Sequence, residues 1–196
     1  MYPFRPADPI QRRGPFDDPR FIYELKHDGF RALAHITPND CRLISRRGNV
    51  YKSFSSLRES LMSLKCETVL DGEIVVLDGT GRPQFYELLR RRGEPIFYAF
   101  DVLMLDGQDL RSLPLLERKN ILRRVVRKHR RILYARHFEQ NGCDLFRLAC
   151  DQDLEGIVAK RRDAVYGEDW FKIRNPNYSQ YEGRQELFEK RVKTAV

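Results

Sequence analysis

Cysteine is scarce in this sequence, and its few copies are unpaired. The four among its 196 residues are Cys41, Cys66, Cys143 and Cys150. No two of them form a C-x-x-C pair, and none of the four histidines stands near them at the spacing of metal ligands. These absences argue against a zinc site and a disulfide framework, and they predict reduced thiols, as in a cytoplasmic protein.

Long hydrophobic runs are missing as well. The longest, such as 95–100 and 156–159, are far shorter than the roughly 20 apolar residues that a membrane span needs. The first residues lack the apolar core of a signal peptide. We therefore expect no membrane partner and no secretion signal.

Acidic residues are outnumbered by basic ones, 28 to 36, which gives a formal net charge of +8. Of the 36 cations 27 are arginine, whose planar guanidinium suits bidentate contacts to phosphate. A genome rich in arginine codons explains the same count equally well. The charge therefore permits a nucleic-acid partner without naming one.

The hydrophobic pattern predicts more strands than helices. The proline-rich residues 1–20 are expected to form an extended lead-in. Strands are predicted at 21–25, 31–36 and 41–45 as an antiparallel meander, and then at 68–77, 96–105, 132–135, 156–160 and 170–174. Helices are predicted at 55–64, with a serine as N-cap, and at 84–91, 115–128, 143–150 and 185–192. The absence of a regular βαβ rhythm favours an α+β fold with largely antiparallel sheets.

One octapeptide, residues 24–31, combines residue types that packing alone does not require. Lys26 ends an apolar strand and is followed by the Asp28-Gly29 pair and by Arg31. Lysine is costly to bury, and between two sheets desolvation and nearby cations would lower its pKa and expose a nucleophilic amine. A hairpin with a surface lysine fits the octapeptide equally well.

Further motifs decide between these interpretations. Residues 26–31 (KHDGFR) resemble the K-x-D-G-x-R signature of covalent nucleotidyltransferases, the superfamily of ATP-dependent DNA ligases, RNA ligases and mRNA capping enzymes. Five other segments resemble family motifs in the same order: 45–48 (SRRG), 71–73 (DGE), 97–101 (FYAFD), 155–158 (EGIV) and 172–174 (KIR). The resemblance is greatest to the adenylation domain of bacterial ATP-dependent DNA ligases, and it implies two mainly antiparallel sheets, flanked by helices, with a nucleotide cleft between them, as in ATP-grasp-like folds.

The resemblance implies that Lys26 is the catalytic nucleophile and becomes lysyl-AMP. Lys172 and Arg174 would lower the pKa of its amine and offset charge on the phosphate. Arg174 stands where the family usually has lysine, so that its reach and geometry differ. Standing alone, residues 172–174 would fit a strand with a solvated polar face.

The same resemblance assigns the remaining site residues. Glu24, Arg31, Glu73 and Phe100 would bind the nucleotide, with Glu73 and Arg31 at the ribose and the Phe100 ring on the adenine. Glu155, with Glu73, would hold Mg²⁺ or Mn²⁺. Arg46 would contact a nucleic-acid phosphate or the pyrophosphate end of ATP. Each segment also has an ordinary structural explanation, as a hairpin, a core aromatic residue or a surface acid.

The implied organisation is a lead-in at 1–20, an adenylation domain at 21–174 and a polar extension at 175–196. The 22 residues after Arg174 are too few for the oligonucleotide-binding (OB) barrel that usually follows in such ligases. We therefore expect a stand-alone domain that seals nicked double-stranded DNA in repair or recombination, with a separate protein as the possible source of the barrel. Two alternatives remain: a non-catalytic DNA- or nucleotide-binding module, and an RNA ligase or guanylyltransferase.

Overall fold

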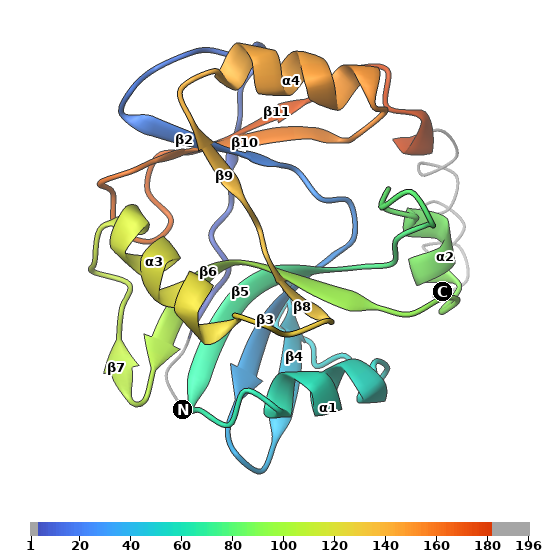
Figure 1. Ribbon diagram of the computed structural model, residues 1–196, viewed down its shortest axis with the longest axis vertical. Coiled ribbons are helices and arrows are strands. Elements are labelled where there is room, and N and C mark those ends of the chain that lie inside the picture. Colours follow the sequence, from blue (N-terminus) through green and yellow to red (C-terminus); the bar gives the residue numbers. More distant parts are fainter. Residues whose placement is uncertain (1–3, 182–196) are drawn as a thin grey trace, which may run out of the picture.

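The computed structural model describes residues 4–181 and contains two β-sheets, one above the other in Figure 1. The first sheet has the strand order β1-β11-β10-β2-β9. Its strands are β1 (Ile10–Gln11), β2 (Phe21–Leu25), β9 (His137–Glu139), β10 (Gly156–Arg161) and β11 (Trp170–Arg174). Helix α4 (Gly142–Asp151) covers it and buries Leu145 and Ala149 against Tyr23 and Ile157.

The second sheet has the order β4-β3-β5-β6-β7, with β8 paired to β6. Its strands are β3 (Phe30–Ile36), β4 (Cys41–Ser45), β5 (Thr68–Val75), β6 (Ile96–Leu105), β7 (Gln108–Asp109) and β8 (Ile132–Tyr134). Helices α1 (Ser55–Met62), α2 (Phe85–Leu89) and α3 (Leu115–Val125) accompany it, and a 3₁₀ turn spans Ser179–Tyr181. The core of this sheet includes Leu57 and Leu61 of α1 and Leu122 of α3.

Most neighbouring strands are antiparallel; β1 with β11 and β6 with β8 are parallel. The expected α+β class, with two mainly antiparallel sheets flanked by helices, is confirmed. Within residues 4–181, none of the helices has the length and apolar character needed to cross a bilayer. No disulfide joins any of the four cysteines, all of which lie within the described residues.

The predicted meander is wrong in its first pairing, because β2 and β3 belong to different sheets, and right in its second, because β3 and β4 pair antiparallel. β2 pairs with β10 and β9, whereas β3 pairs with β4 and β5. The Asp28-Gly29 pair is not a tight hairpin turn: a Cβ on Gly29 would lie 2.1 Å from the Ile74 carbonyl oxygen of β5. Asp28 is buried and accepts a hydrogen bond from the Tyr178 hydroxyl at 2.8 Å. The segment after Lys26 therefore carries the chain from one sheet to the other.

Other differences are smaller. The N-cap of α1 is Phe54, in the left-handed region at φ 74°, and no serine side chain caps the helix. The short strands β1, β7 and β9 escaped the sequence pattern because each has only two or three residues. The helix predicted at 185–192 lies outside the described residues.

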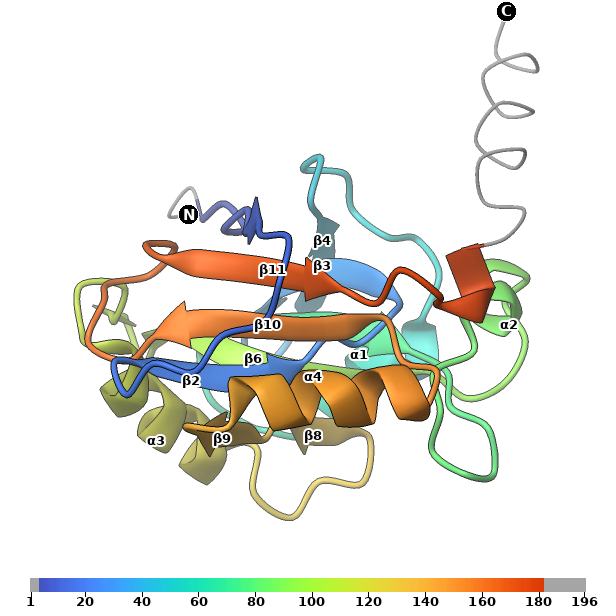
Figure 2. The same cartoon turned by 90° about the horizontal axis from the view of Figure 1, so that it is seen from above.

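The N-terminal lead-in joins the two sheets. Phe4 packs with Leu33 and Leu103 of the second sheet, and Ile10–Gln11 pairs with β11 of the first. We call residues 4–12 the N-terminal strap. Figure 2 shows the strap beside β11, on the side of the molecule opposite to β9 and α3.

Candidate active site

Lys26 follows β2 directly, and its ammonium is paired with a buried carboxylate. The Lys26 Nζ atom donates a hydrogen bond to Glu155 Oε2 at 2.7 Å. The Lys26 backbone N–H bonds the Gly156 carbonyl at 2.9 Å, which continues the β2–β10 pairing. The Tyr181 hydroxyl donates to Glu155 Oε1 at 3.0 Å. Lys26 and Glu155 are 129 positions apart in the sequence and are brought together by adjacent strands.

Lys172 on β11 lies in a group of cations. Burial lowers the pKa of Lys172; Arg174, Arg46 and Lys26 lower it further, and Asp8 opposes them. The Lys172 Nζ lies 3.9 Å from Asp8 Oδ1, and the Arg46 guanidinium contacts Asp8 Oδ2. The structure therefore brings Lys26, Lys172, Arg174 and Arg46 close enough to influence one charge.

Glu73 on β5 is half-buried, and the pKa of its carboxyl is raised. Burial raises the pKa of its carboxyl to about 8, and Lys26 and Arg31 oppose the rise. Glu155 and Asp28 add to it, because like charges disfavour ionisation. Within the described residues no side chain donates a hydrogen bond to this carboxyl. At neutral pH a largely protonated Glu73 can both donate to and accept from a hydroxyl group.

Glu73 should make stability depend on pH. Because its folded pKa is raised from 4.5 to about 8, the native state holds an extra proton between these values, and stability falls as pH rises through them. Glu73 is partly exposed, so we expect only about 1–2 kcal/mol, or about 3–6 °C in Tm. Glu73→Gln should melt close to wild type at pH 5 and about 3–6 °C higher at pH 9. Equal melting temperatures of the two proteins at pH 9 would contradict the raised pKa.

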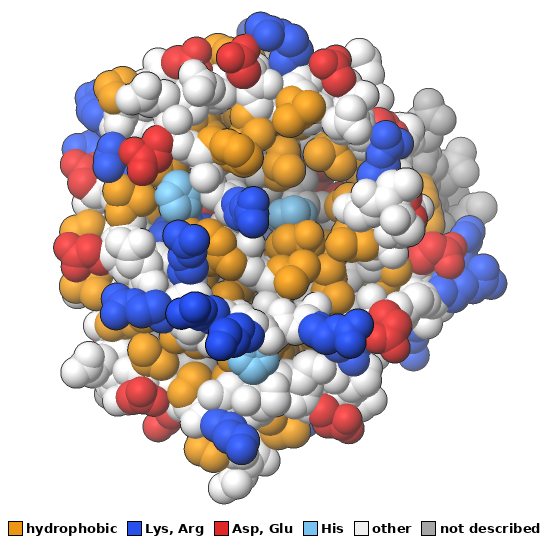
Figure 3. All heavy atoms as spheres, in the orientation of Figure 1, with side chains coloured by type: hydrophobic (Ala, Val, Ile, Leu, Met, Phe, Trp, Pro, Cys, Tyr) orange, Lys and Arg blue, Asp and Glu red, His pale blue; other side chains and the backbone are white. Residues whose placement is uncertain are grey.

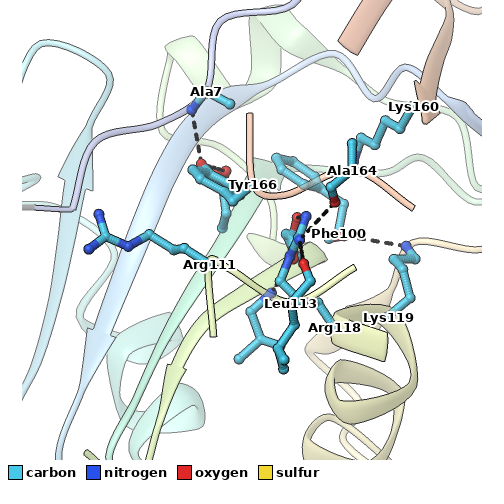
Figure 4. Close-up of polar contacts among 12 residues, drawn as sticks. Ala7, Phe100, Arg111, Leu113, Arg118, Lys119, Lys160, Ala164 and Tyr166 are labelled. Atoms are coloured by element: carbon cyan, nitrogen blue, oxygen red, sulfur yellow. Dashed lines mark hydrogen bonds and ion pairs between the residues drawn. The ribbon is translucent and has the colours of Figure 1, made fainter. Parts of the chain in front are cut away.

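Arg31 on β3 is held by Asp71, the first residue of the D-G-E motif, for which the sequence predicted no partner. Its Nε and Nη2 atoms bond Asp71 Oδ1 and Oδ2, each at 2.6 Å. Burial opposes the charge of Arg31, but Asp71 raises its pKa above the ordinary value. The Tyr166 hydroxyl also donates to Asp71 and accepts from the Ala7 N–H at 2.9 Å, a contact drawn in Figure 4. Arg31 is therefore fixed beside the expected ribose site rather than free to reach it.

Phe100 on β6 lies under two cations. The Arg31 guanidinium carbon is 4.5 Å and the Lys160 ammonium 4.4 Å from its ring centroid. Tyr98, two residues earlier on the same strand, stacks on His27 with ring centroids 3.8 Å apart. Burial lowers the pKa of His27 to about 4, so this ring is neutral at physiological pH. The sequence did not predict this aromatic pair, because His27 stands at the variable position of the K-x-D-G motif.

Glu24, the remaining predicted nucleotide contact, lies in a buried ion cluster. Its Oε1 accepts from Lys119 at 2.5 Å and its Oε2 from Lys160 at 2.7 Å. Burial alone would raise the pKa of Glu24, but the two ammonium groups hold it below its ordinary value. Figure 4 shows Lys119 also directed at the Phe100 carbonyl, with a distance of 3.3 Å. Both carboxylate oxygens of Glu24 thus have partners on α3 and β10.

Asp101 of the F-D motif has a comparable role in the core. It forms a bidentate pair with Arg118, at 2.8 and 3.0 Å, and both side chains are fully buried. Arg118 also donates to the carbonyls of Leu113 and Ala164 (Figure 4). This motif therefore anchors α3 and the segment after β10 to the second sheet.

Few carboxylates near Lys26 could hold a metal ion. Within residues 4–181 no three His, Cys, Asp or Glu side chains form a group that could enclose a metal ion. Glu73 and Glu155 nevertheless lie close enough for one to raise the pKa of the other. Two such oxygen donors fit Mg²⁺, which takes one or two carboxylates and completes its shell with water and substrate phosphates.

Comparison with known proteins gives consistent results. Residues 12–175 match the family model described as ATP dependent DNA ligase domain. The chain is 32% identical over 178 residues to the SPbeta prophage-derived DNA ligase-like protein LigB of Bacillus subtilis strain 168, covering 85% of this chain and 65% of LigB. It is 34% identical over 167 residues to the multifunctional non-homologous end joining protein LigD of Pseudomonas aeruginosa, covering 79% of this chain and 20% of LigD.

A solved structure of mycobacterial DNA ligase D complexed with ATP and MES superposes with a TM-score of 0.76 at 28% identity, covering 87% of this chain and 60% of that one. An archaeal ATP-dependent RNA ligase shares the fold with a TM-score of 0.56 at 19% identity, covering 96% of this chain and 56% of that one. The chain thus spans less than two thirds of the length of each of these proteins.

Proposed function

The chain belongs to the ATP dependent DNA ligase domain family, and on that premise we propose that it transfers AMP from ATP through Lys26 to the 5′-phosphate of a DNA nick. The observation that carries the proposal is the placement of Lys26 between the two sheets, paired with Glu155 and within the influence of Lys172. The adjacent 3′-hydroxyl would then displace AMP and seal the strand.

In the first step the Lys26 amine attacks the α-phosphorus of ATP. A nitrogen–phosphorus bond forms, the bond to the bridging oxygen of the β-phosphate breaks, and pyrophosphate leaves with that electron pair. The attacking ammonium must lose its proton, and Glu155, at 2.7 Å, is the nearest acceptor. The product is a phosphoramidate that stores the activation for transfer to DNA.

The first sheet, with Arg46 from the second, would bind the phosphates, and the rest of the second sheet would bind the nucleoside. Lys172 and Arg174 on β11 offset phosphate charge, and Arg46 faces them from the end of β4. Glu73, protonated at neutral pH, would hold the ribose hydroxyls beside Arg31. The aromatic residues of β6 supply flat surfaces for adenine, with Phe100 as the predicted stacking partner.

Glu155 and Glu73 are the residues that would hold Mg²⁺ or Mn²⁺, since both are acids near Lys26, and Glu73 would have to lose the proton that it holds at neutral pH to do so. When bound, the ion would offset negative charge on the phosphates of ATP. The residues themselves would keep the amine and the ribose in place.

A nucleic-acid substrate is supported by the surface charge. Residues 118–138 contain nine Lys and Arg residues and no acidic one. Figure 3 shows Lys and Arg side chains in a band across the face that carries α3 and β8. Six of these side chains are exposed and form no ion pair with another residue of the described chain: Arg123, Arg124, Arg127, Lys128, Arg130 and Arg136. Such a band attracts the phosphate backbone without reading sequence.

Incubation with α-labelled ATP, Mg²⁺ and pyrophosphatase tests the proposal. Wild-type protein should retain label after denaturation, and Lys26→Ala should lose it because the amine that forms the phosphoramidate is removed. Lys52→Ala, which removes an exposed lysine outside the site, should label like wild type. If the wild-type protein takes up no label, the chain is a binding module and the enzymatic proposal fails.

The same assay separates the remaining alternatives. Labelled GTP in place of ATP tests guanylyl transfer, and a panel of nicked DNA and nicked RNA tests the substrate. Label from ATP together with sealing of nicked DNA is the expected result. Sealing of nicked RNA alone would assign the chain to RNA ligation instead.

A further inference from the structure

The N-terminal strap places an acid among the cations assigned to phosphate. The Asp8 carboxylate contacts the Arg46 guanidinium through Oδ2, and its Oδ1 lies 3.9 Å from Lys172 Nζ. Asp8 raises the pKa of Lys172, against the effect of burial and of the neighbouring cations. A carboxylate with one oxygen toward each cation lies where an oxygen-rich anionic ligand would lie.

Backbone contacts on both sides of Asp8 hold it there. The Ala7 N–H donates to the Tyr166 hydroxyl at 2.9 Å, and the Ala7 carbonyl accepts from Arg31 at 3.3 Å. On the other side Ile10–Gln11 pairs with β11, and the Arg12 N–H bonds the Lys172 carbonyl at 3.0 Å. The Asp8 side chain is therefore presented to the cations by an anchored segment, although it is more than half exposed itself.

We propose that Asp8 determines the phosphate affinity of the site, because its carboxylate occupies the place of a phosphate group between Arg46 and Lys172. The inference rests on the proposed function in assigning these two cations to phosphate. A phosphate group that binds both cations must displace Asp8, so the site holds phosphate more weakly than its cations alone would. Weak retention favours release of pyrophosphate after lysyl-AMP forms, and thus disfavours the reverse reaction.

The ligand chemistry is a phosphate group, and it has two possible sources. One is the pyrophosphate end of ATP, and the other is the 5′-phosphate of a nick. Titration of metal-free protein with inorganic pyrophosphate measures the first. Titration with nicked duplexes that carry either a 5′-phosphate or a 5′-hydroxyl measures the second.

Asp8→Asn should tighten binding of pyrophosphate, of the 5′-phosphorylated nick, or of both, by about fivefold at low salt, which corresponds to removal of one unit charge about 4 Å away in water. The gain should shrink at high ionic strength. It should be smaller in the Arg46→Ala background, where Asp8 and the phosphate compete for Lys172 alone. The 5′-hydroxyl nick should bind equally to both proteins.

Asp144→Asn is the matched control, because Asp144 is an exposed acid paired with Arg147 on α4. It should bind both probes like wild type. Unchanged or weaker binding of both probes by Asp8→Asn overturns the inference. The titrations need no covalent step, so a protein that fails to label but shows the Asp8 effect would overturn only the proposed function.

Discussion

Gly156→Ala is expected to destabilise the protein by about 3–5 kcal/mol, a sum of backbone strain and overpacking. Gly156 has φ +134°, which L-residues rarely adopt, and a Cβ there would lie 2.1 Å from the Ile173 carbonyl oxygen. The Cβ would also lie 2.9 Å from the Arg174 Cα. Both of these neighbours are backbone atoms, which cannot move aside as a flexible side chain can. The pairing of β10 with β11 would have to open, and the distance between Glu155 and Lys172 would increase. Urea unfolding measures the loss, and labelling by ATP should fall with it.

Gly79→Ala is the matched control for this substitution. Nothing lies within 4 Å of a Cβ at Gly79, and its backbone does not require glycine. We expect its free energy of unfolding to remain within about 0.5 kcal/mol of wild type. If Gly156→Ala were equally mild, the close approach of β10 and β11 would be wrong.

Glu24→Gln is expected to cost about 3–5 kcal/mol, because it leaves two buried ammonium groups without their counter-charge. Lys119 and Lys160 both bond Glu24, and all three side chains are buried. The uncompensated lysines would have lowered pKa values, so the native state would hold fewer protons and regain stability as pH rises toward 10. Thermal melts of variant and wild type from pH 7 to 10 should therefore converge. The exposed acid Glu139, paired with Arg162, supplies the control Glu139→Gln, with little expected change.

The same variant decides what Glu24 does. As a nucleotide contact alone, its loss would leave the melting temperature unchanged and raise the ATP concentration needed for labelling. As the centre of the buried cluster, its loss lowers the melting temperature first. A stable Glu24→Gln protein with poor ATP use would contradict the structural role of Glu24.

The local hydrophobic pattern was sufficient to predict the bounds of several strands, but not which strands pair with one another. The strands at 96–105 and 170–174 have the predicted bounds, because long apolar or alternating runs report directly on burial. The predicted pairing of β2 with β3 was wrong because strand pairing depends on contacts between residues far apart in the sequence. One such contact is the packing of Gly29 against Ile74, which the neighbouring residues in the sequence do not indicate.

The candidate site shows the same division. The order of motifs identified Lys26 and Glu155, and the structure places them in contact. Asp71 and Asp8 were missed as partners of Arg31 and Arg46, which are 40 and 38 positions away in the sequence. Asp8 stands in a proline-rich segment without a periodic pattern, so its neighbours can be known only from the fold.

The division of the site between two sheets has a mechanical consequence. Lys26, Lys172 and Arg174, which are proposed for phosphate, lie on or beside the first sheet, and Glu73, which is proposed for the ribose, lies on the second together with Arg46 at the end of β4. A nucleotide that contacts both sheets would link them, so that part of its binding free energy would stabilise the packing of one sheet against the other. In lysyl-AMP the phosphate end of this link would be covalently bonded to Lys26 until AMP is transferred to DNA. The N-terminal strap already contacts both sheets at one side of the molecule, and the nucleotide would contact both between them.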